Sequence, residues 1–101
     1  MSAATEGLDS LIHAPARLRI MVTLAGIGAD NTLSFARLQQ LLDLTAGNLI
    51  THLRKLDEGG YVEMAKSRRR GSTETSVHIT SAGQAAFDRY RHTLTELLGE
   101  A

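Results

Sequence analysis

The chain has 101 residues, 43% of them hydrophobic, which suits one domain with a modest core and leaves no room for a second. Lysine plus arginine equals aspartate plus glutamate at 11 each, so net charge does not indicate a nucleic-acid binder and only the placement of charges can. The absence of cysteine excludes disulfides, zinc–thiolate sites and a thiol nucleophile.

The N-terminus, MSAATEGLDS, has neither the basic start nor the apolar run of a signal peptide, and no apolar run could span a bilayer. We therefore expect a cytoplasmic protein without membrane contact, in which residues 1–7 are disordered. From Leu8 to Leu24 apolar residues recur at three- and four-residue intervals, which indicates a helix. Pro15 interrupts this pattern, so we predict a short helical turn, a break, and a helix that begins near Pro15 and ends around Gly28.

Two further helices follow in close succession. Residues 32–33 predict a very short strand, and Ser34 is a suitable N-cap for a helix over 35–42. After a tight turn, Thr45 can cap a third helix, and the region 45–58 then pairs with the preceding helix as a helix-turn-helix.

The third helix has one apolar and one polar side. At about 100° per residue, Leu49, Leu53 and Leu56 fall on the same side, which predicts that they attach the helix to the core. The residues that point away from them are Gly47, Asn48, Thr51, Arg54 and Lys55.

The C-terminal half predicts a β-hairpin and a last helix. Gly59 and Gly60 supply a helix exit, residues 61–64 begin a strand, and residues 73–79 alternate as a half-buried second strand. The polar segment KSRRRGS between them reads as the turn of the hairpin. A helix over 80–99, capped by Thr80 or Ser81, then carries an apolar stripe of Phe87, Tyr90, Leu94, Leu97 and Leu98.

This order of elements is that of a winged helix-turn-helix domain: mainly α with a small β-hairpin (α+β) and a C-terminal dimerisation helix. The stretches HAPARLRIM, FARLQQLLDLTAGNLITHLRKLDEGGYVEM and RRRGSTETSVHITSAGQAAFDRY resemble the single-domain winged-helix regulators of the MarR-like and ArsR-like kind, above all the short MarR-like family described as winged helix DNA-binding domain. The likeness covers almost the whole chain, from about Leu8 to Leu98. It implies a transcriptional regulator, here expected to be a repressor and a homodimer.

In helix-turn-helix proteins the second helix of the pair enters the major groove, which makes residues 45–58 the expected recognition helix. Gly47 costs roughly 1 kcal/mol relative to alanine within a helix, but it lets the backbone approach a surface closely. Asn48 can donate to and accept from a base edge at once. The alternative is an irregular helix start that touches nothing. The DNA-binding residues expected on this helix are Thr45, Ala46, Gly47, Asn48, Thr51, His52, Arg54 and Lys55.

Three residues near the recognition helix each have two possible interactions, one with DNA and one within the chain. His52 lies at the margin of the leucine stripe, where packing against the first helix or bonding to a carbonyl is preferred to direct DNA contact. Arg17 could reach a phosphate, but pairing with an acid of the same chain is preferred, and Arg37 is a similar case.

The predicted hairpin is the wing of the fold, and its tip, residues 66–73, is strongly basic. Lys66, Arg68, Arg69 and Arg70 place four positive charges within five residues. Such a cationic tip suits phosphates or a narrow minor groove, whereas the alternative is a solvated charged turn.

The stripe on the last helix exceeds what a domain of this size needs to cover its core. We therefore expect part of Phe87, Tyr90, Leu94, Leu97 and Leu98 to meet a second copy, with packing inside one chain as the alternative. A two-fold dimer would separate two recognition helices by roughly 34 Å, one turn of B-DNA, and would predict a palindromic operator.

The sequence contains no carboxylate pair, Ser-His-Asp set or glycine-rich phosphate loop at a useful spacing, so we expect no enzyme activity and no cofactor. His13, His52, His78 and His92 are scattered, which leaves a metal site weakly motivated. The resemblance to MarR-like proteins implies that any small-molecule effector lies between the domain and its last helix. The rival function is a winged helix that binds a partner protein, and an apolar recognition face would favour it.

Overall fold

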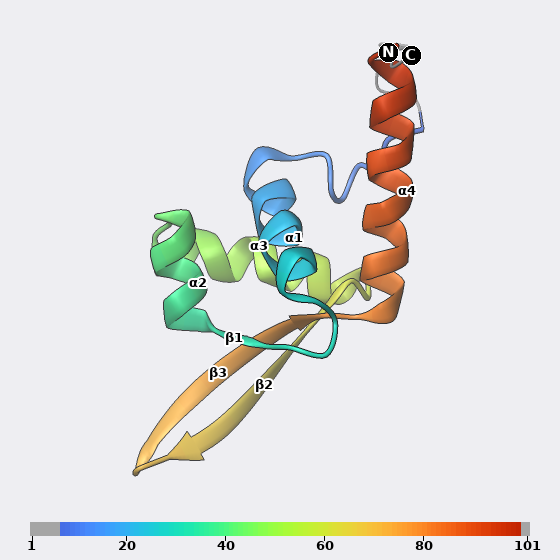
Figure 1. Ribbon diagram of the computed structural model, residues 1–101. Helices are drawn as coiled ribbons and strands as arrows, with labels where there is room; N and C mark the ends of the chain where they lie inside the picture. The colour runs from blue at the N-terminus through green and yellow to red at the C-terminus, as the bar shows by residue number, and fades with distance from the viewer. Residues whose placement is uncertain (1–6, 100–101) are drawn as a thin grey trace.

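The computed structural model describes residues 7–99, which form four helices and three strands (Figure 1). The elements run in the order α1 (Pro15–Ile27), β1 (Leu33–Ser34), α2 (Phe35–Leu42), α3 (Ala46–Glu58), β2 (Val62–Arg69), β3 (Ser72–Ile79) and α4 (Ser81–Leu97). This is the predicted winged helix-turn-helix order. The expected disorder of residues 1–7 lies, except for Gly7, outside the described residues.

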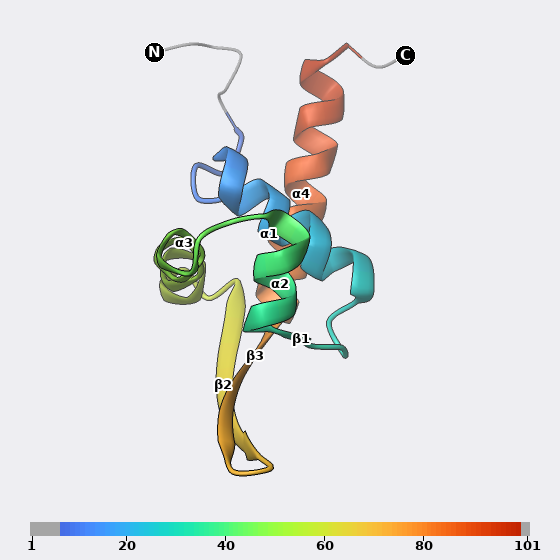
Figure 2. The same cartoon turned by 90° about the vertical axis from the view of Figure 1, so that its left-hand side faces the viewer.

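The three strands form one antiparallel sheet in the order β1-β3-β2. The long hairpin of β2 and β3, the wing, extends away from the helices, and the second half of α4 extends in the opposite direction (Figures 1 and 2). The wing, predicted to meet DNA, and the end of α4, predicted to meet a second copy, therefore lie at opposite ends of the structure.

Hydroxyl caps begin three of the helices, as predicted from the sequence. The side chains of Ser34, Thr45 and Thr80 accept hydrogen bonds from Arg37 N, Asn48 N and Gly83 N at 3.0, 3.1 and 2.9 Å. Each bond satisfies one backbone donor that the first helical turn leaves without a partner.

The exit from α3 uses the predicted pair of glycines. Gly60 has a φ of 82°, and the amides of Gly60 and Tyr61 donate to the carbonyls of Asp57 and Leu56 at 2.9 Å each. This is the pattern of a Schellman motif, in which a residue with positive φ reverses the chain directly after a helix. It sends the chain from α3 straight into β2.

One hydrophobic core joins the helices to the base of the wing. The leucine stripe of α3 is completely buried, as predicted. The buried set is Ile12, Ile20, Met21, Leu24, Leu38, Leu42, Leu49, Leu53, Leu56, Val62, Val77, Ile79, Ala86, Phe87 and Tyr90. The orientations of α3, the wing and α4 therefore depend on the same core.

Two expectations need correction. The segment KSRRRGS was predicted to be the turn of the hairpin, but β2 continues to Arg69 and β3 begins at Ser72, so the turn itself consists only of Arg70 and Gly71. Phe87 and Tyr90 are only 7% and 3% exposed, since they pack in the chain's own core and leave little surface for a second copy. The stripe of α4 is thus divided between core and surface.

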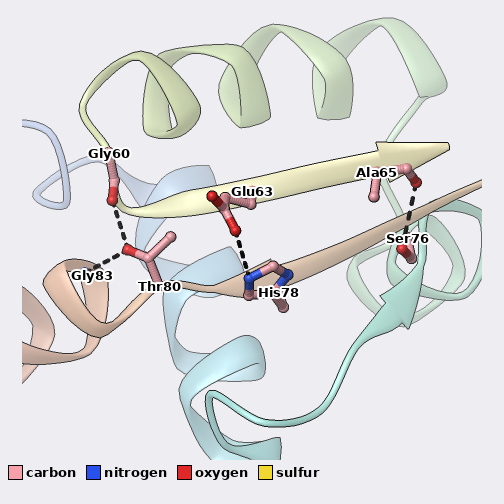
Figure 3. Close-up of polar contacts among 7 residues, drawn as sticks. All are labelled: Gly60, Glu63, Ala65, Ser76, His78, Thr80 and Gly83. Carbon is pink, nitrogen blue, oxygen red and sulfur yellow. Dashed lines mark hydrogen bonds and ion pairs between the residues drawn. The ribbon is translucent and has the colours of Figure 1, made fainter.

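Polar contacts hold the start of α4 against the base of the wing (Figure 3). The Thr80 hydroxyl donates to Gly60 O at 2.6 Å while it accepts from Gly83 N, and Thr80 N donates to Tyr61 O at 3.0 Å. Gly83 faces the Tyr61 carbonyl so closely that a Cβ there would lie 2.9 Å from the Tyr61 carbonyl carbon and closer still to its oxygen. Only glycine fits at this junction.

We predict that Gly83→Ala lowers the free energy of unfolding by about 1–3 kcal/mol, because backbone rather than a flexible side chain blocks the added Cβ. Urea unfolding followed by circular dichroism measures the change. The matched control is Gly47→Ala in α3, where a Cβ meets nothing within 4 Å and should leave stability unchanged or raise it by up to about 1 kcal/mol. Equal stability of the two variants would contradict the close packing at Gly83.

Candidate nucleic-acid interface

The polar face predicted for α3 is exposed, because the buried leucine stripe fixes the rotation of the helix about its axis. All residues of that face point to solvent, and so do the N-cap Thr45 and the first helical residue Ala46. His52, at the margin, is partly buried. The structure thus places every predicted residue of the recognition helix except His52 on one open surface.

Several side chains on this surface retain their hydrogen-bonding capacity. Within the described residues, the Asn48 amide and the Arg54 guanidinium make no hydrogen bond or ion pair, whereas the Thr51 hydroxyl donates to Gly47 O at 2.8 Å. Asn48 can therefore both donate and accept, while Thr51 offers a methyl group and oxygen lone pairs. An amide of this kind matches the paired donor and acceptor of an adenine edge.

His52 packs against the first helix, as the preferred reading expected. Arg17 donates through Nη1 to His52 Nδ1 at 3.3 Å and through Nε to the carbonyl of Leu11 at 2.5 Å. The expected pairing of Arg17 with an acid is wrong, because its hydrogen bonds go to an imidazole and a carbonyl. Arg17 instead ties α3 to α1 and to the segment before it.

Arg19 and Arg37 differ in whether their side chains already bind a group within the described part of the chain. Arg19 donates to the carbonyl of Leu42 at 2.8 Å, which satisfies an acceptor at the end of α2. The exposed Arg37 side chain has no hydrogen bond or ion pair in the described part of the chain. Of these two arginines, Arg37 is the one available to a partner.

The wing turns at its tip in two residues. Arg70 and Gly71 have φ angles of 52° and 83°, and Arg69 pairs with Ser72 across the hairpin. Positive φ at both central residues is the pattern of a type I′ turn, which matches the twist of the strands it joins. An arginine in the left-handed region costs roughly 1–2 kcal/mol, so this tip is set by the hairpin rather than by local preference.

Register divides the residues of the wing between two faces. Side chains alternate along a strand, so Lys66 and Arg68 lie on the face that also carries the buried Val62, and their partners across the hairpin are Thr75 and Thr73. The opposite face carries Glu63, Ser67 and Glu74, and Glu63 pairs with His78 Nε2 at 2.9 Å (Figure 3). Lys66 and Arg68 therefore continue the helix-facing side of the wing beyond the core.

A hollow, the α3–wing groove, separates the recognition helix from the wing. Its lining residues come from four elements: Phe35, Ile50, Arg54, Met64, Lys66 and Thr75. The sequence prediction found the two cations but missed the other four residues. The alternate positions Val62, Met64, Lys66 and Arg68 could have indicated that one strand face carries both Met64 and Lys66. This pattern is hard to recognise because the polar segment that follows Met64 resembles a turn.

The exposed part of the α4 stripe lies near its C-terminal end. Leu94 is partly buried against the core, whereas Leu97 is 42% and Leu98 74% exposed. The structure thus separates the predicted interface residues into Phe87 and Tyr90, which are core, and Leu97 and Leu98, which are surface.

Other kinds of site are not found in residues 7–99. That range holds no cluster of three or more histidine, cysteine, aspartate or glutamate side chains suited to a metal ion. None of its helices has the length and hydropathy needed to cross a membrane.

The partial burial of His52 beside Arg17 makes stability depend on pH. Burial lowers the pKa of His52 from 6.5, and the charges of Arg17 and Lys55 lower it further. Because the unfolded chain binds this proton more readily, the contribution is complete above about pH 6.5 and is lost as the pH falls through the lowered folded pKa. We predict that the wild type loses more stability than His52→Asn between about pH 7.5 and pH 5. Urea midpoints of both proteins test this, and parallel pH profiles would contradict it.

Comparisons with known proteins agree with this geometry. The family described as winged helix DNA-binding domain matches residues 16–98. An uncharacterized protein of Methanocaldococcus jannaschii, MJ0432, is 36% identical over 87 residues, which cover 86% of this chain and 91% of the relative. The structure of a transcriptional regulator homologue from Pyrococcus horikoshii superposes with a TM-score of 0.80 at 31% identity, over 88% of this chain and 85% of that one.

The fold is also that of an ArsR family transcriptional regulator, RHA00566, with a TM-score of 0.57 at 13% identity over 97% of this chain and 93% of the other. The match of the family model extends from the start of α1 to the end of α4 and so includes α3 and the wing. This chain belongs to the winged helix DNA-binding domain family.

Proposed function

We propose that the chain is a sequence-specific double-stranded DNA-binding transcriptional regulator that acts as a homodimer and represses transcription by occluding promoter DNA. All 101 residues would serve one DNA-binding domain, which needs neither catalysis nor a cofactor and works where the DNA is, in the cytoplasm. The observation that carries the proposal is that Arg54 of α3 and Lys66 of the wing, which make no hydrogen bond or ion pair within the described residues, line one groove beside the exposed polar face of α3.

Gly47 gives this proposal independent support. It sits in the first turn of α3, its φ is not positive, and a Cβ would meet open space, so neither backbone conformation nor packing requires glycine. A glycine that the fold does not need is explained by a close approach of another molecule to the helix backbone. A DNA base edge at the adjacent Asn48 would bring that approach about.

The rival function, docking of a partner protein on the recognition helix, finds less support. The large hydrophobic side chains exposed in residues 7–99 are Val22, Leu41, Leu97 and Leu98, and none of them belongs to α3. Protein interfaces are depleted of lysine, whereas α3 presents the exposed Lys55. The exposed leucines of α4 fit the proposed second copy instead.

The direct test of the proposed function is fluorescence anisotropy with a random duplex and with the chain's own upstream DNA. We expect preference for the upstream duplex and, for about six phosphate contacts per dimer, a loss of affinity on the order of a thousandfold between about 50 and 200 mM salt. Joint replacement of Arg68, Arg69 and Arg70 by alanine should weaken binding to both duplexes. The Gly47→Ala variant should remain as stable as the wild type but lose specific binding to the upstream duplex. If the wild type binds neither duplex at low salt, the proposal is rejected.

The proposed dimer is tested with Leu98→Asp, which places a charge at the C-cap of α4, on a leucine that is 74% exposed. We expect a folded monomer by light scattering and weaker binding to a palindromic duplex, because two half-sites no longer act together. The matched control is Leu41→Asp on α2, a leucine that is 47% exposed and outside the proposed interface. A dimer that survives Leu98→Asp, or a monomeric wild type, would contradict this interface.

A further inference from the structure

The α3–wing groove combines an apolar floor with a cationic rim. Phe35, Ile50 and Met64 are partly buried and form the floor, and the groove has a volume of about 340 Å³. Arg54 and Lys66 line the same groove from different elements, are exposed, and make no hydrogen bond or ion pair within the described residues. Two unpaired positive charges that share one hollow repel each other, and an anion between them removes that repulsion.

The chemistry of the lining suits a phosphodiester joined to sugars better than it suits a free anion. A phosphate is an anion that both cations can bind, and the Thr75 hydroxyl in the lining can donate to one of its oxygens. The carbon-rich faces of the adjoining deoxyriboses can cover the apolar floor. A hydrated inorganic anion would leave that floor exposed to water.

The helix α3 directs Asn48 and Arg54 to different sides. Arg54 follows Asn48 by six residues, so it lies about 9 Å farther along the helix axis and, at about 100° per residue, points about 120° away from it. When α3 lies in the major groove with Asn48 at a base edge, Arg54 therefore points toward a side of that groove, where the phosphates are.

We propose that the α3–wing groove is the seat of a single phosphodiester, held jointly by Arg54 and Lys66, with Thr75 as a third donor and two deoxyriboses against Phe35, Ile50 and Met64. The inference rests on the proposed DNA-binding function. One phosphate shared by the recognition helix and the wing would fix the position of both elements on the duplex. Thr75 and Phe35 then become DNA-contact residues that no charge pattern indicates.

The test uses a duplex that the wild-type protein selects from a random library, with one phosphate at a time replaced by a neutral methylphosphonate. We expect one position at which neutralisation weakens wild-type binding about tenfold or more. Arg54→Ala and Lys66→Ala should each become insensitive to neutralisation at that same position. The matched control, Arg70→Ala at the tip of the wing, should keep full sensitivity there.

Thr75→Val tests the third donor without changing the shape of the strand residue. It should weaken binding several-fold and reduce the effect of the methylphosphonate at the same position. If Arg54→Ala and Lys66→Ala lose sensitivity at different positions, and the double variant shows additive losses, the shared seat is wrong while DNA binding stands. Failure of the wild type to select or bind any duplex would overturn both proposals.

Discussion

The burial of the leucine stripe of α3 is the constraint on which the exposed surface depends. Leu49, Leu53 and Leu56 are completely buried, and complete burial of a leucine stabilises a fold by about 1.5–3 kcal/mol. Their sum is comparable with the roughly 5–15 kcal/mol that stabilises a whole domain. Rotation of α3 about its axis would expose this stripe and would therefore unfold the chain. The same leucines that stabilise the domain thus decide that Asn48 and Arg54 face outward.

The wing obtains its position from the same core. Val62, Val77 and Ile79 are completely buried at its base, and the close contact between Gly83 and the Tyr61 carbonyl fixes the start of α4 beside it. Beyond that base the hairpin is held by cross-strand pairing and by its two-residue turn, without a core of its own. Because side chains alternate along a strand, the face that is buried at the base continues along the wing, where it presents lysine and arginine instead of valine.

Sequence reasoning succeeded where one local signal was sufficient. The caps Ser34, Thr45 and Thr80 and the stripe of α3 depend on local patterns in which successive residues are no more than four positions apart, and all were confirmed. The polar half of the wing was misread because strands beyond a core lose the hydrophobic alternation that identifies them.

The α4 stripe and the contacts of Arg17 show the same limit over longer distances. Periodicity identifies which residues of α4 are apolar, but not whether the chain itself or a second copy covers them, so Tyr90 could not be assigned before the packing was known. The contact of Arg17 with His52 joins residues 35 positions apart, and the position of His52 at the margin of the leucine stripe indicates packing against the first helix but not Arg17 as the partner. The α3–wing groove likewise combines four elements whose meeting is a property of the fold.

The balance of charges bears on how the proposed regulator would discriminate between DNA sequences. The chain is neutral overall, and the wing places Glu63 and Glu74 on the face opposite Lys66 and Arg68. At physiological salt, charges farther apart than about 8 Å are largely screened, so attraction to DNA depends on the local cations rather than on a field of the whole molecule. Non-specific binding, which is electrostatic, should then be weak. Under this arrangement affinity depends on correct docking of α3, which favours a reader of sequence over a general DNA-coating protein.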